Sequence, residues 1–295
     1  MKNNYNFLKG TGVALVTPFN SNGSVDYNSL EKIINSTIHG GVDYLVILGT
    51  TSESPTLSEK EKEKIISYVV KKNNERVPLV IGIGGNNTNN LIDRIKKIND
   101  SSFSAILSVS PYYNRPSQFG IFKHYEKIVS ISNLPIILYN VPSRTGSNIE
   151  INTVTDLNKN FEKIIGIKEA SGNLLSIMNL ISNTPKHFHV ISGDDLLALP
   201  TVLAGGSGVI SVIANVFPNQ IKKMVELGFN NDVRESYKIH YELMKIINLI
   251  FEEGNPSGIK YLLSKKNLSN NIVRLPLNEI SLSLKRKIDK ELELI

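Results

Sequence analysis

A single lysine follows a short apolar run near the middle of the chain. Residues 164–167 read Ile-Ile-Gly-Ile, Lys168 comes next, and Ser171-Gly172 opens a loop. The run is typical of a buried strand, and burial lowers the pKa of an ammonium group, which makes the neutral amine available as a nucleophile. Such a lysine could form a Schiff base with a ketone. The alternative is a strand-end lysine whose stem is buried while its ammonium group reaches water, and this segment alone leaves both open.

Other chemically able side chains also follow apolar runs. Tyr139 ends one run, where its phenol could donate and accept a proton, although it could equally be a packing tyrosine. Arg144 lies in a short loop and could bind a carboxylate through two parallel hydrogen bonds, unless it is an ordinary surface arginine. Thr50 and Thr51 offer hydroxyl and backbone N–H groups that suit a carboxylate or a phosphate, and loop capping is their alternative.

The elements that must position these side chains are predicted by hydrophobic patterning. Short runs rich in Val, Ile and Leu recur at fairly even intervals, which is typical of strands buried on both faces. They span residues 12–17, 44–48, 79–83, 105–109, 136–139, 164–168, 189–192 and 208–211. Segments with helical periodicity lie between them, among them 27–39, 58–72 and 117–131. Asp26, Ser58 with Glu61, and Thr88 are suited to cap such helices.

This alternation predicts an α/β fold, a (β/α)8 TIM barrel with a C-terminal helical extension. A doubly wound sheet would carry a nucleotide-binding fingerprint after the first strand, and the sequence has none. Strand signals stop near residue 231, and residues 233–251, 257–264 and 277–294 have helical patterns, with a break at Gly254-Asn255-Pro256. We therefore expect a catalytic barrel over residues 1–230 and a helical domain over residues 231–295. In such barrels chemistry gathers at the C-terminal ends of the strands, which places these candidates on one rim.

Composition narrows the class of protein. The chain has 295 residues, of which 41% are hydrophobic and 20% charged, as in an ordinary soluble globular protein. The net charge of +6 is spread over helices that mix Lys with Glu, as in residues 59–64, and this argues against a nucleic-acid partner. No apolar run approaches the roughly 20 residues of a membrane span, and residues 1–6 lack the apolar core of a secretory signal. We expect a cytoplasmic protein without a membrane partner.

Several kinds of site are disfavoured as well. The chain has no cysteine, which excludes disulfides, thiolate metal sites and cysteine nucleophiles. Its five histidines show no metal-binding spacing, and its glycine-rich loops match neither a Walker nor a Rossmann pattern. We expect no metal and no cofactor.

Five segments, taken in chain order, carry a resemblance to a known family. They are Gly-Thr-Thr-Ser-Glu at 49–53, Pro-Tyr-Tyr-Asn-Arg-Pro at 111–116, Tyr-Asn-Val-Pro-Ser-Arg-Thr-Gly at 139–146, Gly-Ile-Lys-Glu at 166–169 and Gly-Asp-Asp at 193–195. Over nearly its full length the chain resembles the 4-hydroxy-tetrahydrodipicolinate synthase (dihydrodipicolinate synthase) family of pyruvate-dependent class I aldolases. The lysine segment and Tyr-Asn-Val-Pro belong to the wider superfamily, which includes N-acetylneuraminate lyase. The Thr-Thr pair and the Ser-Arg-Thr-Gly tail are more specific to the synthase.

The resemblance implies a lyase that condenses pyruvate with L-aspartate-4-semialdehyde, on the diaminopimelate route to lysine. Lys168 would form the Schiff base with pyruvate, and Tyr139 would pass protons to and from the imine and enamine. Thr50 and Tyr113 would complete a hydrogen-bonded relay with Tyr139. In this family Tyr113 would come from a neighbouring subunit, so the resemblance also implies a homo-oligomer, a homotetramer built as a dimer of dimers.

The same resemblance implies the substrate-binding residues. Thr51 would hold the pyruvate carboxylate, with the backbone of Ile210 nearby and Gly193 on the same rim. Arg144 would bind the carboxylate of aspartate semialdehyde. Anionic substrates agree with a rim that carries an arginine and amide donors.

Two alternatives stay open at this point. The first is a sister aldolase that acts on a sugar acid, of the N-acetylneuraminate or 2-keto-3-deoxygluconate type. Arg144 separates the two, because sugar acids need contacts to hydroxyl groups where the synthase needs a carboxylate clamp. The second is a catalytically silent binding protein on the same barrel, which the joint presence of Lys168, Tyr139, Thr50 and Tyr113 disfavours.

The sequence departs from the family pattern at two places. Ser52 stands where the family usually has Gly, and Ser would cost about 1 kcal/mol there if the position needs a positive φ. In relatives that lysine inhibits, histidine and glutamate ligands bind the effector, whereas this chain has Glu59, Lys62 and Asn90 at those positions. We therefore expect weak or absent inhibition by lysine, and inhibition well below millimolar concentration would contradict this.

Overall fold

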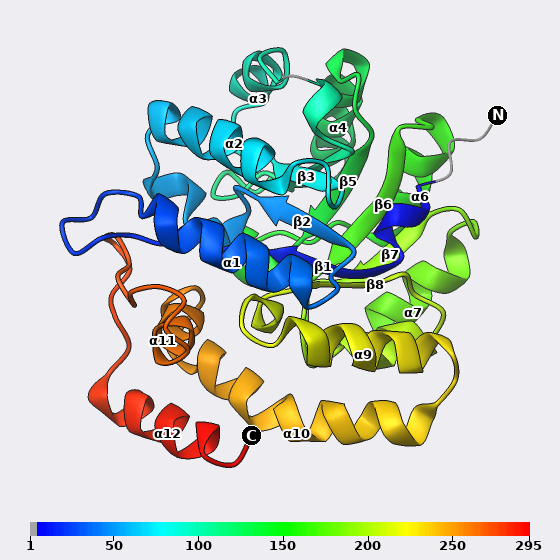
Figure 1. Cartoon of the computed structure of the whole chain (residues 1–295). Coiled ribbons are helices and arrows are strands. Elements are labelled where there is room, and N and C mark those ends of the chain that lie inside the picture. Colours follow the sequence, from blue (N-terminus) through cyan, green and yellow to red (C-terminus); the bar gives the residue numbers. More distant parts are fainter. Residues whose placement is uncertain (1–4, 99) are drawn as a thin grey trace.

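Parallel strands close into a barrel in the computed structural model, which describes residues 5–98 and 100–295 (Figure 1). The strands are β1 (Gly10–Ala14), β2 (Tyr44–Ile47), β3 (Leu79–Gly82), β4 (Ala105–Val109), β5 (Ile136–Asn140), β6 (Ile164–Glu169), β7 (His189–Ser192) and β8 (Gly208–Ser211). Neighbours pair in chain order, and β1 pairs with β8 to complete the circle. The predicted TIM barrel is confirmed.

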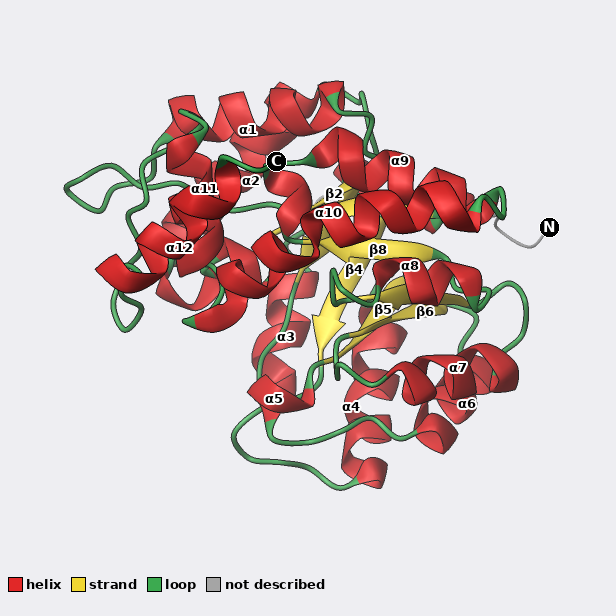
Figure 2. Ribbon diagram, turned by 90° about the horizontal axis from the view of Figure 1, so that it is seen from below, coloured by secondary structure: helices red, strands yellow, loops and turns green. Residues whose placement is uncertain are grey.

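The helices form a layer outside the strands (Figure 2). In the barrel they are α1 (Tyr27–His39), α2 (Glu59–Asn73), α3 (Thr88–Ile95), α4 (Gln118–Ile131), α5 (Pro142–Thr145), α6 (Ile151–Asn160), α7 (Leu174–Asn183), α8 (Ala198–Leu203) and α9 (Pro218–Phe229). Because helices cover the outer face and side chains fill the interior, nearly every strand residue is buried. This explains why the strands read as unbroken apolar runs.

Two of the three predicted helix caps are confirmed. Asp26 accepts a hydrogen bond from the Ser29 N–H group, and Ser58 and Glu61 form a reciprocal capping box. The third prediction was wrong by one residue, because Asn87 and not Thr88 caps α3. The Thr88 hydroxyl instead lies 2.9 Å from His124 Nδ1.

The first strand begins and ends earlier in the chain than the predicted range, residues 12–17. β1 begins at Gly10 and ends at Ala14. Past that point the side chain of Asn215 replaces a neighbouring strand, because its amide donates to the Ala14 carbonyl (2.9 Å) and accepts from the Val16 N–H group (3.2 Å). A side chain that arrives from so far along the sequence leaves no local pattern.

Three further helices follow the barrel, α10 (Val233–Glu252), α11 (Ser257–Lys265) and α12 (Leu282–Leu292). α10 lies alongside α9, and α12 lies alongside α10 (Figure 1). The last helix begins later than residue 277, because Ser281 binds the carboxylate of Glu253 and then caps the helix through the Leu284 N–H group. The division into domains at residue 231 stays a prediction. Within the described residues, no helix has the length and apolarity that crossing a membrane requires.

Candidate active site

Lys168 and Tyr139 lie side by side at the C-terminal end of the barrel. They are paired directly in the register between β5 and β6, near the last residue of each strand. Their side chains are largely buried, with 5% and 7% exposed, and Lys168 Nζ lies 4.6 Å from the centre of the tyrosine ring. The strand pairing alone thus brings a buried amine against a phenol.

The carboxylate next in sequence to this amine is engaged elsewhere. Glu169 accepts hydrogen bonds from Asn140 Nδ2 and from the Ser171 N–H group, both at 2.8 Å. Successive residues of a strand point to opposite faces, so Glu169 faces away from Lys168. Its role is to join the ends of β5 and β6 to the loop that follows.

Thr50 and Thr51 come from a single helical turn, η2 (Thr50–Ser52), directly after β2. The Thr50 hydroxyl lies 3.5 Å from the hydroxyl of Tyr139. Thr51 is buried, and its Oγ1 accepts a hydrogen bond of 3.0 Å from Asn255 Nδ2. The bond from Asn255 leaves the hydroxyl hydrogen of Thr51 free to be donated in another direction.

The strained residue of this turn is Glu53 and not Ser52. Glu53 has φ 54° and ψ 35°, the left-handed conformation that non-glycine residues rarely adopt. Ser52 is buried, and its hydroxyl donates a 2.5 Å hydrogen bond to the Leu15 carbonyl. The possible backbone penalty at Ser52 therefore does not arise, and its side chain ties the turn to the end of β1.

Arg144 lies on α5, the short helix after β5. Its guanidinium is exposed and donates a 3.3 Å hydrogen bond from Nη2 to the Asn255 carbonyl. Within the described part of the chain, this bond leaves most of the N–H donors of Arg144 without a partner. The residue therefore presents a fork of N–H groups at the rim.

These side chains border one cavity of about 280 Å³ at the C-terminal end of the strands. Its lining comprises Thr50, Thr51, Tyr139, Val141, Ser143, Arg144, Lys168, Ala170, Gly193, Asp194, Leu196, Val212, Ile247, Asn248, Phe251 and Asn255. The charged members are Arg144, Lys168 and Asp194. An excess of positive charge in a small cleft favours an anionic ligand.

Gly193 is packed against the stem of Lys168. A Cβ atom at this position would lie 2.9 Å from Lys168 Cε and 2.6 Å from the Cβ of Ala170. Both distances are too short for ordinary contact, so the glycine leaves the space that the lysine side chain occupies.

Asn255 is a lining residue that sequence reasoning missed. It contacts both Thr51 and Arg144, and its Oδ1 is buried without a hydrogen-bond partner among the described residues. The sequence predicted only a helix break at this point. The available signal was the Asn-Pro dipeptide after a long helix. Such a dipeptide indicates a turn, but it does not indicate which residues the turn contacts.

Two predicted site residues are placed differently from the rest. Tyr113 lies on the loop after β4 with φ 71° and is 89% exposed, so its ring points away from its own barrel core. Ile210 is buried in β8, two residues before Val212, which borders the cavity. The backbone N–H groups of Val212 and Ile213 donate to Asp195 (3.0 and 3.1 Å), whose pKa is raised by burial.

A second cavity of about 370 Å³ also borders Thr50 and Tyr139, and it extends toward Lys62, Arg94 and Tyr112. Lys62 forms an ion pair with Glu59, at 2.7 Å. The cationic side chains of Lys62 and Arg94 at this wall agree with the expectation that lysine inhibits weakly or not at all. That expectation stays a prediction.

The chain matches known proteins over nearly its full length. The model of the dihydrodipicolinate synthetase family matches residues 7–295. The chain belongs to this family. It is 53% identical over 280 residues to the 4-hydroxy-tetrahydrodipicolinate synthase of Flavobacterium psychrophilum, with 95% of this chain and 96% of the relative covered. It is 50% identical over 282 residues to the enzyme of that name from Karelsulcia muelleri, with 95% of each chain covered.

A solved structure has the same fold. The chloride-inhibited dihydrodipicolinate synthase of Acinetobacter baumannii, complexed with pyruvate, superposes with a TM-score of 0.94 at 34% identity and covers 97% of this chain and 98% of its own. The family resemblance and the predicted enzyme class are confirmed.

Proposed function

We propose that the chain is a 4-hydroxy-tetrahydrodipicolinate synthase, which condenses pyruvate with L-aspartate-4-semialdehyde through a Schiff base on Lys168. The observation that carries this is the buried amine of Lys168 beside Tyr139, in a cavity that also holds Arg144. Membership of the family supports the substrate pair.

The covalent steps use the amine of Lys168 twice. Its neutral Nζ adds to the ketone carbon of pyruvate, and loss of water gives the imine. Removal of a proton from the methyl group gives the enamine, whose carbon attacks the aldehyde of the second substrate and forms the new C–C bond. The amino group of that substrate then adds to the imine carbon and displaces Lys168, so that the ring closes and the amine is regenerated.

Tyr139 and Thr50 carry the protons of these steps. A phenol with a pKa near 10 is a poor base alone, so proton transfer at neutral pH needs a partner that takes the proton onward. The contact of 3.5 Å between the two hydroxyl groups supplies that partner within the chain.

The carboxylates of the two substrates are held by different residues. The hydroxyl of Thr51, oriented by Asn255, donates to the carboxylate of pyruvate, with the backbone of Ile210 and Gly193 close by. The guanidinium of Arg144 binds the carboxylate of aspartate semialdehyde. Holding both reactants beside one amine is the main source of rate enhancement in such a site.

The active form is a cytoplasmic homotetramer in which Tyr113 completes the relay of a neighbouring subunit. The exposure of Tyr113 supports this, because a tyrosine held away from its own core is available to a second copy of the chain.

Trapping with borohydride tests the proposal. Pyruvate with borohydride should leave a reduced adduct on Lys168, located by peptide mass spectrometry, and Lys168→Ala should abolish it. Turnover with aspartate semialdehyde should exceed turnover with N-acetylneuraminate or 2-keto-3-deoxygluconate. An adduct that is missing, or that forms on another lysine, would contradict the mechanism, and preference for a sugar acid would contradict the substrate.

A further inference from the structure

A fully buried ion pair lies next to the catalytic turn, and the mechanism above does not use it. Lys260, on α11, binds the carboxylate of Glu53, and both side chains are 0% exposed. Lys260 Nζ also donates to the Ile272 carbonyl at 2.9 Å and lies 4.0 Å above the centre of the Phe19 ring. The lysine is thus held on three sides.

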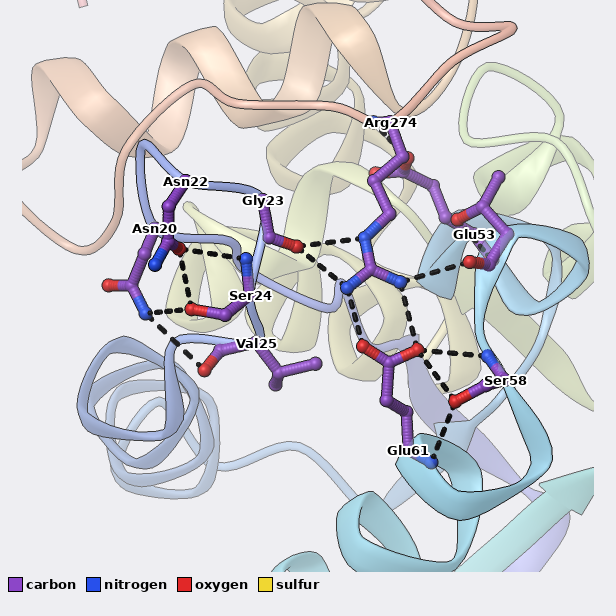
Figure 3. A network of polar contacts seen from close by, with 10 residues as sticks. Asn20, Asn22, Gly23, Ser24, Val25, Glu53, Ser58, Glu61 and Arg274 are labelled. Atoms are coloured by element: carbon purple, nitrogen blue, oxygen red, sulfur yellow. Dashed lines mark hydrogen bonds and ion pairs between the residues drawn. The ribbon is translucent and has the colours of Figure 1, made fainter.

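Glu53 is held at its second oxygen as well. The backbone N–H group of Arg274 donates to Glu53 Oε2 at 2.9 Å. Arg274 is itself anchored, because its guanidinium binds the Gly23 carbonyl and the Glu61 carboxylate (Figure 3). The carboxylate of Glu53 therefore has a donor on each oxygen and little freedom to rotate.

The backbone of Glu53 closes the turn that carries the two threonines. Its N–H group donates to the Thr50 carbonyl at 3.1 Å, and its φ of 54° is the left-handed value that ends the turn. An isolated non-glycine residue in that conformation is disfavoured, because its Cβ atom lies too close to the carbonyl oxygen that follows. A conformation of this kind persists where the surroundings over-determine it, and here the fixed side chain does so.

The pair is a poor device for stability alone. The free-energy cost of removing two charges from water offsets most of their mutual attraction. A protein with a well-packed apolar pair in the same place is often as stable. This cost is visible at Lys260, where burial lowers the pKa to about 8 although Glu53 opposes the change. The pair instead fixes the position of the turn, because it joins the turn to the helices after the barrel.

We propose that Lys260 and Glu53 are positioning residues for catalysis, which hold the Thr50–Ser52 turn so that Thr50 meets Tyr139 and Thr51 meets the pyruvate carboxylate. This inference rests on the roles proposed above for the two threonines. Neither residue of the pair needs to touch substrate.

Three variants test the proposal: Lys260→Met, Glu53→Gln and the double variant that carries both changes. A misplacement of about 1 Å can lower a rate about 100-fold. We therefore expect kcat to fall about 10- to 100-fold and the KM for pyruvate to rise in each variant. The KM for aspartate semialdehyde should stay within about 2-fold, because Arg144 lies on a different element.

The matched control is Lys265→Met, on the same helix. Lys265 also forms an ion pair, with Asp289 at 3.0 Å, but its side chain is 41% exposed. Its kinetic constants should equal those of the wild type. Thermal unfolding and circular dichroism of every variant separate altered catalysis from loss of the folded state.

The double variant decides the matter if a single variant fails to fold, because it leaves no unpaired buried charge. A folded double variant with the kcat and KM of the wild type would overturn the inference. A loss of activity that only matches the loss of folded protein would overturn it as well. Failure of all three variants to fold would assign the pair a structural role and would also overturn it. In the same experiment, a wild-type enzyme without a pyruvate adduct on Lys168 would contradict the proposed function itself.

Discussion

Tyr139 connects the two ends of the proposed proton path. Its ring lies beside Lys168 Nζ, and its hydroxyl lies within reach of Thr50. In the proposed mechanism only the hydroxyl takes part in the chemistry, while the ring fills space at the end of β5. Fold and reaction therefore depend on different atoms of one residue.

Tyr139→Phe should separate these roles. We expect kcat to fall by about two to four orders of magnitude, the usual range for loss of a general acid or base. The midpoint of thermal unfolding should change little, because the ring is retained. Steady-state kinetics and a melting curve measure both quantities, and a kcat within a few-fold of the wild type would contradict the relay.

Gly193→Ala should disturb Lys168 without removing it. The added Cβ would lie 2.9 Å from Lys168 Cε, so either the lysine stem or the strand must move. We expect slower imine formation with pyruvate, and overpacking should lower the free energy of unfolding by about 1 to 3 kcal/mol. Borohydride added at timed intervals after pyruvate gives the rate of imine formation. An unchanged rate in a folded variant would show that the close contact has no catalytic consequence.

At the scale of elements, the rim is joined to the helical extension by a network of charges and amides. Arg274 follows α11 and contacts Glu61 in the first turn of α2, which is 213 residues earlier in the chain. Hydrogen bonding from Arg274 lowers the pKa of Glu61 to about 2. The carboxylate thus stays ionised well into the acid range in the folded protein.

This shift predicts how stability depends on pH. The pKa of an unfolded glutamate is about 4.3, so between about pH 4.3 and 2 the unfolded chain binds more protons at this position than the folded chain does. The stabilisation from Glu61 is therefore present above pH 4.3 and lost as pH falls toward 2. Glu61→Gln should flatten the pH dependence of the free energy of unfolding in this window.

Denaturant titrations across that range would measure the effect. Glu63→Gln serves as the control, because Glu63 is exposed on the same helix. Equal slopes for the two variants would show that the Glu61–Arg274 contact does not form in solution.

For the whole molecule, the main consequence is assembly. In the proposed oligomer, a relay that borrows Tyr113 from a neighbour would make each active site depend on two chains. Lys168→Ala and Tyr113→Phe should each be nearly inactive alone. Mixed after reversible dissociation, they should regain part of the activity, since some mixed oligomers contain one site with both residues intact.

Activity assays on the mixture, followed against mixing ratio, measure this recovery. Native mass spectrometry of the mixture, which separates mixed from unmixed oligomers when one variant is isotope-labelled, is the control for exchange of subunits. Failure to regain activity when exchange is demonstrated would contradict a shared active site.

The sequence predicted the strands and the rim because both depend on local pattern. Strands β4, β7 and β8 match their predicted ranges, since strands buried on both faces have nearly unbroken apolar runs. Lys168 and Tyr139 could be found because they end such runs, and the barrel brings all strand ends to one face. The family resemblance supplied the roles of the threonines and of Tyr113.

Contacts between distant segments could not be predicted. The bond between Asn255 and Thr51 joins residues 204 positions apart, and no local pattern records it. The end of β1 depends on Asn215, and the start of α12 depends on Glu253, for the same reason. The buried pair of Lys260 and Glu53 was hidden as well, because each residue alone looks like an ordinary helix or loop charge.

These long-range contacts set an order of events during protein synthesis. The barrel strands leave the ribosome before the helices that follow the barrel, and the Thr50 turn emerges directly after β2. Its anchors at Asn255, Lys260 and Arg274 are translated 204 to 221 positions after the residues of the turn that they hold. A nascent chain can therefore form its barrel strands while the Thr50 turn still lacks these anchors, and the turn gains its full support only after Arg274 has been made.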